Sequence, residues 1–112
     1  MTTQSLPHND TVFVLTVTYN APLKRVDELL QAHREWLDTH FSSGLFLASG
    51  PRVPRTGGVI LARAADRAEV EALILTDPFV LGGVADYDIV QFQPSRGPFA
   101  TSLVTGTTAE QT

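Results

Sequence analysis

The chain has 112 residues, enough for one domain with its own core but not for two. Hydrophobic residues make up 43% of it and charged residues only 18%, which excludes an intrinsically disordered chain or a solvated coiled coil. Twelve acidic residues against eight Lys and Arg give a net charge of −4, so nucleic acid is not an expected partner.

The chain contains no cysteine, which excludes a disulfide framework, a thiolate nucleophile and a cysteine-ligated metal site. The first residues are polar and lack the basic start and apolar run of a secretion signal, so we expect a cytoplasmic protein. No stretch approaches the roughly 20 apolar residues that span a bilayer, and no membrane partner is expected.

The two ends differ in composition from the rest. Residues 1–10 are polar, and residues 95–112 are rich in Thr, Ser and Gly, so we expect an N-terminal tail and a C-terminal tail. Between them, residues 11–94 form the expected single domain. Phe99, Leu103 and Val104 are apolar enough for part of the second tail to dock on a neighbouring surface.

The first half of the domain predicts a strand, a helix and a second strand. Residues 11–19 are β-branched and aromatic, typical of a strand with Phe13 and Leu15 on one face. From Val26 to Phe41 the apolar spacing becomes that of an amphipathic helix, and Gly44 follows where a helix ends. Residues 45–49 predict the second strand, which Gly50 and Pro51 should break.

The second half repeats the order strand, helix, strand. Residues 59–64 predict a third strand, close enough to the second for a hairpin. Asp66 and Glu69 have the spacing of a capping box and should begin a short helix, which Pro78 prevents from continuing. Residues 85–93 predict a fourth strand.

This order, β-α-β-β-α-β, predicts an α+β, ferredoxin-like fold: a four-stranded antiparallel sheet with both helices on one face. If the helices cover the face that carries Phe13 and Leu15, the opposite face still presents Val12 and Val14. An open apolar sheet face usually marks an interface, so we expect a homodimer whose two sheets pack face to face.

The three histidines are the first candidates for chemistry near neutral pH. His8 lies in the expected tail and should be solvated. His33 and His40 are seven residues apart on one helix, about 10.5 Å along its axis, too far to share a metal ion. His40 falls in the last turn, where a partly cationic side chain suits the helix dipole.

His33 lies in the apolar stripe of the helix, which allows two readings. It could be a core histidine bonded to a backbone carbonyl, or it could pair with Asp77 at the end of the second helix. Asp77 in turn could simply initiate an Asx-Pro turn. Because both helices lie on the same face, the two side chains could meet as a general acid–base pair.

Several segments in order and register resemble the YciI-like (YCII-related) family. They are residues 31–37 (QAHREWL), 47–51 (LASGP), 57–60 (GGVI), 77–80 (DPFV) and 82–84 (GGV). The resemblance covers about residues 12–94. It implies a dimeric ferredoxin-like α+β barrel with a pocket at a His–Asp dyad, here His33 and Asp77.

Four further residues are candidates for substrate binding. Ser49, Gly50 and Pro51 would form a pocket wall, where glycine permits close approach to a ligand and Ser49 offers a hydroxyl. A plain turn at the end of a strand is the alternative. Phe79 would be an aromatic wall or a core residue.

The function predicted is that of a small enzyme without cofactor or metal, with lyase- or isomerase-type acid–base chemistry on a cyclic or aromatic carbonyl compound. His33 would move the proton, and Asp77 would orient it and hold its positive charge. The alternative is a non-catalytic module that binds a small molecule in the same pocket. Haem binding or cofactorless oxygenation at His33 is a third class.

Overall fold

The structure, a computed structural model, describes residues 10–105. Four strands, β1 (Thr11–Tyr19), β2 (Phe46–Pro51), β3 (Gly57–Ala64) and β4 (Ala85–Phe92), form one sheet in these residues. The helices are α1 (Leu23–Ser42), α2 (Arg67–Ile74), α3 (Pro78–Leu81) and α4 (Ala100–Thr105). The segments before residue 10, with His8, and after residue 105 lie outside the described residues, so the expected N-terminal tail stays a prediction.

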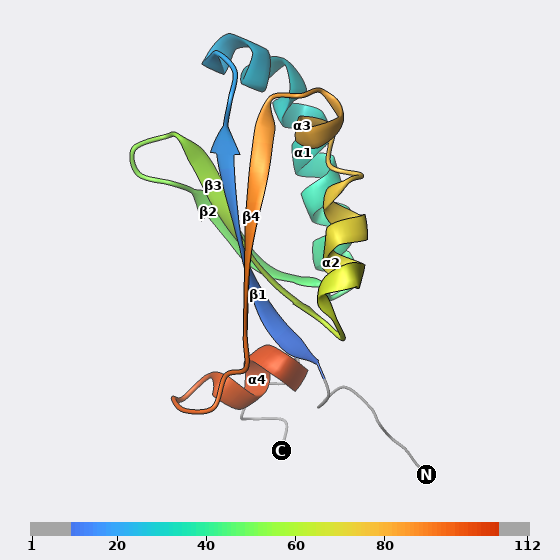
Figure 1. The fold of residues 1–112 in the computed structure, drawn as a ribbon, viewed down its shortest axis with the longest axis vertical. Helices are drawn as coiled ribbons and strands as arrows, with labels where there is room; N and C mark the ends of the chain where they lie inside the picture. The colour runs from blue at the N-terminus through green and yellow to red at the C-terminus, as the bar shows by residue number, and fades with distance from the viewer. Residues whose placement is uncertain (1–9, 106–112) are drawn as a thin grey trace.

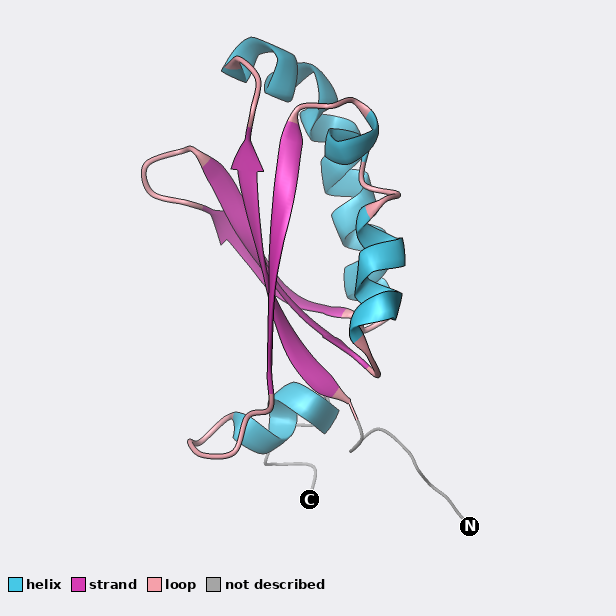
Figure 2. Cartoon of the chain, viewed as in Figure 1, coloured by secondary structure: helices cyan, strands magenta, loops and turns pink. Residues whose placement is uncertain are grey.

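The sheet confirms the predicted ferredoxin-like arrangement. Its strand order is β2-β3-β1-β4, and every neighbouring pair is antiparallel. Figures 1 and 2 show α1, α2 and α3 on one face of this sheet. The first strand, predicted at residues 11–19, has those bounds and lies between β3 and β4.

The core lies between the sheet and these helices. Phe13, Leu15 and Val17 alternate along β1 and are buried against the helices, as the strand pattern predicted. Val26 of α1 and Val70 of α2 belong to the same core. Burial of these side chains fixes the register of the sheet, since a slip of one residue would turn them to the other face.

The helix boundaries follow from local chemistry. Pro22 precedes α1 directly, so the helix begins at Leu23, earlier than the apolar spacing alone predicted. Gly44 has φ +85°, the left-handed conformation that commonly follows a helix. Asp66 caps α2 as predicted: its side chain accepts from Glu69 N at 2.9 Å, while Ala65 N donates to Glu69 Oε1 at 3.2 Å.

The sequence did not predict α3. The second helix does not continue through Pro78, as expected, but ends at Ile74, and Pro78 stands at the start of a four-residue helical turn, Pro78–Leu81. Proline suits this place because its fixed φ is helical and its missing N–H is not needed there. Asp77 is therefore the N-cap of α3, where a carboxylate is stabilised by the helix dipole. The prediction that Asp77 lies at the end of the second helix was wrong, since it begins α3.

Strands β2 and β3 differ slightly from prediction. Gly50 and Pro51 continue β2 instead of breaking it, which is possible because β2 is an edge strand and Pro51 needs no partner for a backbone N–H. The third strand begins at Gly57, where a Cβ atom would lie 1.7 Å from the Val17 carbonyl oxygen. Only glycine lets β3 approach β1 this closely.

Part of the expected C-terminal tail is ordered. Helix α4 packs against β1, at the end of the sheet where β1 begins and β4 ends (Figure 1). Val104 of α4 is buried while Phe99 remains exposed. Val12, expected on the open face, has no exposed surface. The apolar surface left on that face is therefore smaller than the alternation of β1 alone indicated.

An apolar band nevertheless remains on the face away from α1. Val14 lies between Leu61 of β3 and Val90 of β4 in the register of the sheet. Val90 is 58% exposed, and Phe92 and Val59 are also exposed. No helix among residues 10–105 has the length and hydropathy needed to cross a membrane.

Candidate active site

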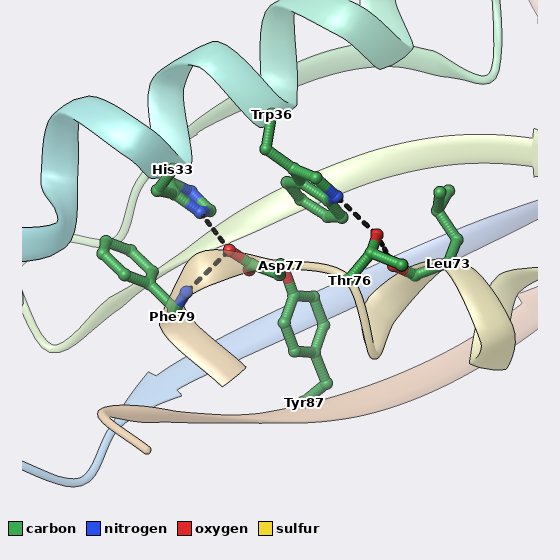
Figure 3. Close-up of polar contacts among 7 residues, drawn as sticks. All are labelled: His33, Trp36, Leu73, Thr76, Asp77, Phe79 and Tyr87. Carbon is green, nitrogen blue, oxygen red and sulfur yellow. Dashed lines mark hydrogen bonds and ion pairs between the residues drawn. The ribbon is translucent and has the colours of Figure 1, made fainter. Parts of the chain in front are cut away.

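His33 and Asp77 form a buried pair between α1 and α3 (Figure 3). His33 Nδ1 lies 2.7 Å from Asp77 Oδ1, and both residues are buried. An ionised carboxylate only accepts hydrogen bonds. The ring proton of His33 is therefore on Nδ1, which donates a hydrogen bond to Asp77. The structure thus brings together the two residues predicted as a dyad, and the partner of His33 is a carboxylate and not a backbone carbonyl.

The Asp77 carboxylate accepts from three donors. Oδ1 accepts from His33 Nδ1 and from Phe79 N at 2.9 Å, and Oδ2 accepts from the Tyr87 hydroxyl at 2.5 Å. Asp77 has no exposed surface, and a buried carboxylate is tolerated only when its oxygens are bonded in this way. The same side chain therefore both begins the helical turn α3 and contacts the imidazole of His33.

Tyr87 was missed by the sequence analysis. It projects from β4 toward Asp77 (Figure 3), and nothing in the alternating pattern of residues 85–92 distinguishes it from an ordinary strand tyrosine. Burial raises the pKa of Tyr87, and the charge of Asp77 and the hydrogen bond to it raise it further. The hydroxyl therefore stays protonated and remains a donor to the carboxylate.

Aromatic rings fix the plane of the His33 imidazole. Phe79 stacks on it with a centroid separation of 3.9 Å and an interplanar angle of 7°, and Trp36 lies at 5.7 Å and 28°. Trp36 is held in turn by a hydrogen bond from Nε1 to Thr76 Oγ1 at 2.8 Å, just before Asp77 (Figure 3). Rotation of the imidazole would break both the stacking and the bond to Asp77.

The second ring nitrogen of His33 is free. Nε2 makes no hydrogen bond with any residue in the range 10–105, and it is not among the side-chain atoms sealed from solvent. His33 lines a pocket of about 550 Å³ on the helix side of the sheet. With the proton held on Nδ1, Nε2 presents a lone pair to whatever occupies this pocket.

The predicted binding residues surround the same pocket. Ser49, Gly50 and Pro51 line it from β2, and Phe79 lines it from α3. Phe79 is also 1% exposed and part of the core, so it serves as both wall and packing residue. The rest of the wall is largely aliphatic and includes Val17, Leu30, Leu37 and Ile60.

Charged side chains at the pocket were not predicted. Asp27 and Arg34 reach it from α1, and Arg55 from the loop between β2 and β3. Arg55 Nη2 lies 2.6 Å from Asp27 Oδ1, and this hydrogen bond is the main cause of the raised pKa of Arg55. An exposed arginine in a helix or a loop carries no sequence pattern that would assign it to a pocket.

His40 lies in the last turn of α1, as predicted. Its ring packs edge-on against Trp36 and Phe46, with centroids 5.1 and 5.2 Å away. Partial burial lowers the pKa of His40, because the charged ring loses hydration there. Within residues 10–105, no three acidic or histidine side chains gather into a group suited to a metal ion.

The fold and the site define a class of protein: a ferredoxin-like α+β domain with a buried His–Asp pair beside an apolar pocket. Residues 12–93 match the sequence model of the YCII-related domain. This match spans most of the chain, which therefore belongs to the YCII-related family.

The structure of a known enzyme has the same fold. The chain is similar to 5-chloro-2-hydroxyhydroquinone dehydrochlorinase (TftG) from Burkholderia phenoliruptrix AC1100, crystallised with 2,5-dihydroxybenzoquinone. The TM-score is 0.66 at 17% identity, covering 75% of this chain and 95% of TftG. SnoaB, a cofactor-independent oxygenase from Streptomyces nogalater, has a TM-score of 0.46 at 11% identity over 79% of this chain and 95% of its own. No curated protein is similar enough in sequence to match.

Proposed function

We propose that this YCII-related protein is a small, cofactor-independent enzyme of the lyase or isomerase type that moves a proton on a cyclic or aromatic carbonyl compound. One observation carries the proposal: His33 Nδ1 is fixed 2.7 Å from a buried carboxylate while Nε2 is free at a pocket. A histidine held in one tautomer by a carboxylate is a general acid–base unit.

The reaction begins with proton abstraction by His33. Nε2 takes a proton from a carbon next to the substrate carbonyl, the C–H electron pair forms a C=C bond, and the carbonyl oxygen becomes an enolate oxygen. The imidazolium is stabilised by the Asp77 charge across the Nδ1 hydrogen bond. An isomerase returns the proton to another ring carbon. A lyase lets the enolate expel a group from the next carbon, which leaves with its bonding electrons.

The walls of the pocket suit a flat substrate. Phe79 offers an aromatic surface, and Gly50 leaves open space, since a Cβ there would meet no atom within 4 Å. We assign substrate contacts to Ser49, Gly50, Pro51 and Phe79. An apolar pocket with few polar groups binds a ring by burial and orients it by those few groups.

The apolar band on the open sheet face supports a homodimer. Val14, Leu61 and Val90 lie side by side across three strands, and Val90 is 58% exposed. In the proposed dimer two such faces pack against each other and leave the pockets on the outer, helix-covered sides. Burial of this band in a partner copy would remove the apolar surface from water.

The proposed proton transfer is tested by hydrogen–deuterium exchange of the substrate in D₂O. Wild-type protein is incubated with a panel of ring carbonyl compounds, including 2,5-dihydroxybenzoquinone, cyclohexenone and a butenolide, and ring protons are followed by NMR. Wild type should accelerate loss of a ring proton signal for at least one compound, and His33→Ala and His33→Gln should lower that rate by about 10² to 10⁴.

Two results would contradict the enzyme. Exchange at the wild-type rate in His33→Gln would remove His33 from the chemistry. Binding of panel compounds without exchange or product, seen as thermal stabilisation alone, would establish the alternative of a non-catalytic binding module on the same fold.

A further inference from the structure

The mouth of the pocket is positively charged although the chain as a whole is acidic. Arg34 and Arg55 line the pocket together with a single surface carboxylate, Asp27, while the net charge of the protein is −4. The Asp77 carboxylate is buried, and it accepts hydrogen bonds from His33, Phe79 N and Tyr87. A surplus of one positive charge therefore has no counterpart among the described residues that line the pocket.

Arg55 forms an ion pair with Asp27 and neutralises its charge. The guanidinium lies 2.6 Å from Asp27 Oδ1 and 5.8 Å from the centre of the Tyr19 ring. This contact ties the loop between β2 and β3 to α1 across the pocket. Because the two charges neutralise each other, neither is left for a ligand.

Arg34 is the unpaired cation. It follows His33 directly on α1, lines the same pocket and is exposed. It makes no hydrogen bond or ion pair with any residue in the described part of the chain, although Asp38 lies four residues further along α1, where helical ion pairs form. Its guanidinium is free to bind an external group.

We propose that the pocket takes a planar ring compound carrying one carboxylate, and that Arg34 binds this carboxylate. The inference rests on the proposed function, since it names the substrate class of the same site. A guanidinium matches a carboxylate through two parallel N–H···O bonds, and a carboxylate conjugated to a ring is coplanar with it. One negative charge balances Arg34, whereas a phosphate dianion would leave a charge unmatched.

The test compares 4-hydroxybenzoate with 4-hydroxybenzamide, which have nearly the same shape and differ in charge. Affinities are measured by calorimetry at low salt, and the His33 imidazole signals are followed by NMR. Wild type should prefer the carboxylate by about fivefold, the range of an exposed ion pair. Arg34→Gln should remove the preference and leave the affinity for the amide unchanged, and Arg34→Lys should retain part of it.

Lys24→Gln is the matched control. Lys24 is also an exposed cation on α1, but it does not line the pocket, so its loss should leave the preference unchanged. The preference should also shrink as salt is raised, because exposed charges are screened. Arg34 has no hydrogen bond or ion pair with another residue in the range 10–105, so the melting temperature of Arg34→Gln should be close to that of wild type.

Three results would overturn the inference: equal affinities in wild type, a preference that survives Arg34→Gln, or no binding of either ring. If the amide alone shifts the His33 signals, a ring compound binds in the pocket but the proposed carboxylate ligand is wrong. If the carboxylate binds through Arg34 while no compound exchanges a proton, the ligand class stands and the proposed enzyme falls.

Discussion

Tyr87 donates its hydroxyl hydrogen to Asp77 Oδ2 at 2.5 Å, on the carboxylate oxygen that does not face His33. The contact joins β4 to the start of α3 and completes the set of donors around a carboxylate with no exposed surface. The orientation of the His33 imidazole therefore depends on β4, although the hydrogen bond and ring contacts of His33 are to residues of α1, of α3 and of its N-cap.

Tyr87→Phe should destabilise the fold by about 1 to 3 kcal/mol, because Asp77 Oδ2 would lose its donor while remaining buried. The loss should depend on pH. The pKa of Tyr87 is raised in the folded state, so its contribution is fully present below the unfolded pKa of about 10 and is lost as pH rises above that value. Urea unfolding at pH 8 and at pH 10.5 should show a smaller difference between wild type and variant at the higher pH. An equal difference at both would contradict the contact.

Asp77→Ala and Asp77→Asn should separate structure from chemistry. Alanine removes the cap of α3 and the acceptor of three donors, which should cost about 3 to 5 kcal/mol of unfolding free energy. Asparagine keeps an oxygen for Phe79 N and His33 Nδ1 but removes the charge, so it should be less destabilising. If the protein exchanges protons as proposed, Asp77→Asn should still slow exchange by at least about 10². Chemical denaturation measures the loss of stability, and the D₂O assay measures the exchange rate. Exchange at the wild-type rate in Asp77→Asn would contradict the role of the Asp77 charge.

Gly57→Ala and Gly50→Ala form a matched pair at the pocket wall. A Cβ at Gly57 would lie 1.7 Å from the Val17 carbonyl oxygen, so β3 would have to separate from β1, and we expect a loss on the order of 3 kcal/mol or more. A Cβ at Gly50 would meet no atom within 4 Å, so that variant should unfold within about 0.5 kcal/mol of wild type. Thermal unfolding of the two variants checks the difference. Similar melting temperatures would contradict the close approach of the two strands.

The sequence predicted elements whose side chains repeat over several turns or along a strand. The period-two pattern of β1 and the apolar stripe of α1 located the core and placed His33 on its inner side. Four residues of α3 are too few for any period, so the cap at Asp77 was read as a helix end. The positions of Tyr87 beside Asp77 and of Arg34 at the pocket were not predicted, because they depend on how separate elements pack, which no local pattern encodes.

The open face of the sheet gives the last prediction, which concerns the proposed homodimer. Val90→Glu places a charge in the apolar band, where Val90 pairs with Val14 in the register of β1 and β4. Burial of an unpaired carboxylate between two sheets is unfavourable, so the variant should be a monomer. Light scattering at micromolar concentration should give the mass of one chain for Val90→Glu and of two chains for wild type. Leu81→Glu is the control, because Leu81 is 74% exposed in α3 on the helix-covered side, and it should remain dimeric. Since the pocket lies on that helix side, monomeric Val90→Glu should still bind a ligand there. A wild-type mass of one chain, or a dimeric Val90→Glu, would contradict the proposed interface.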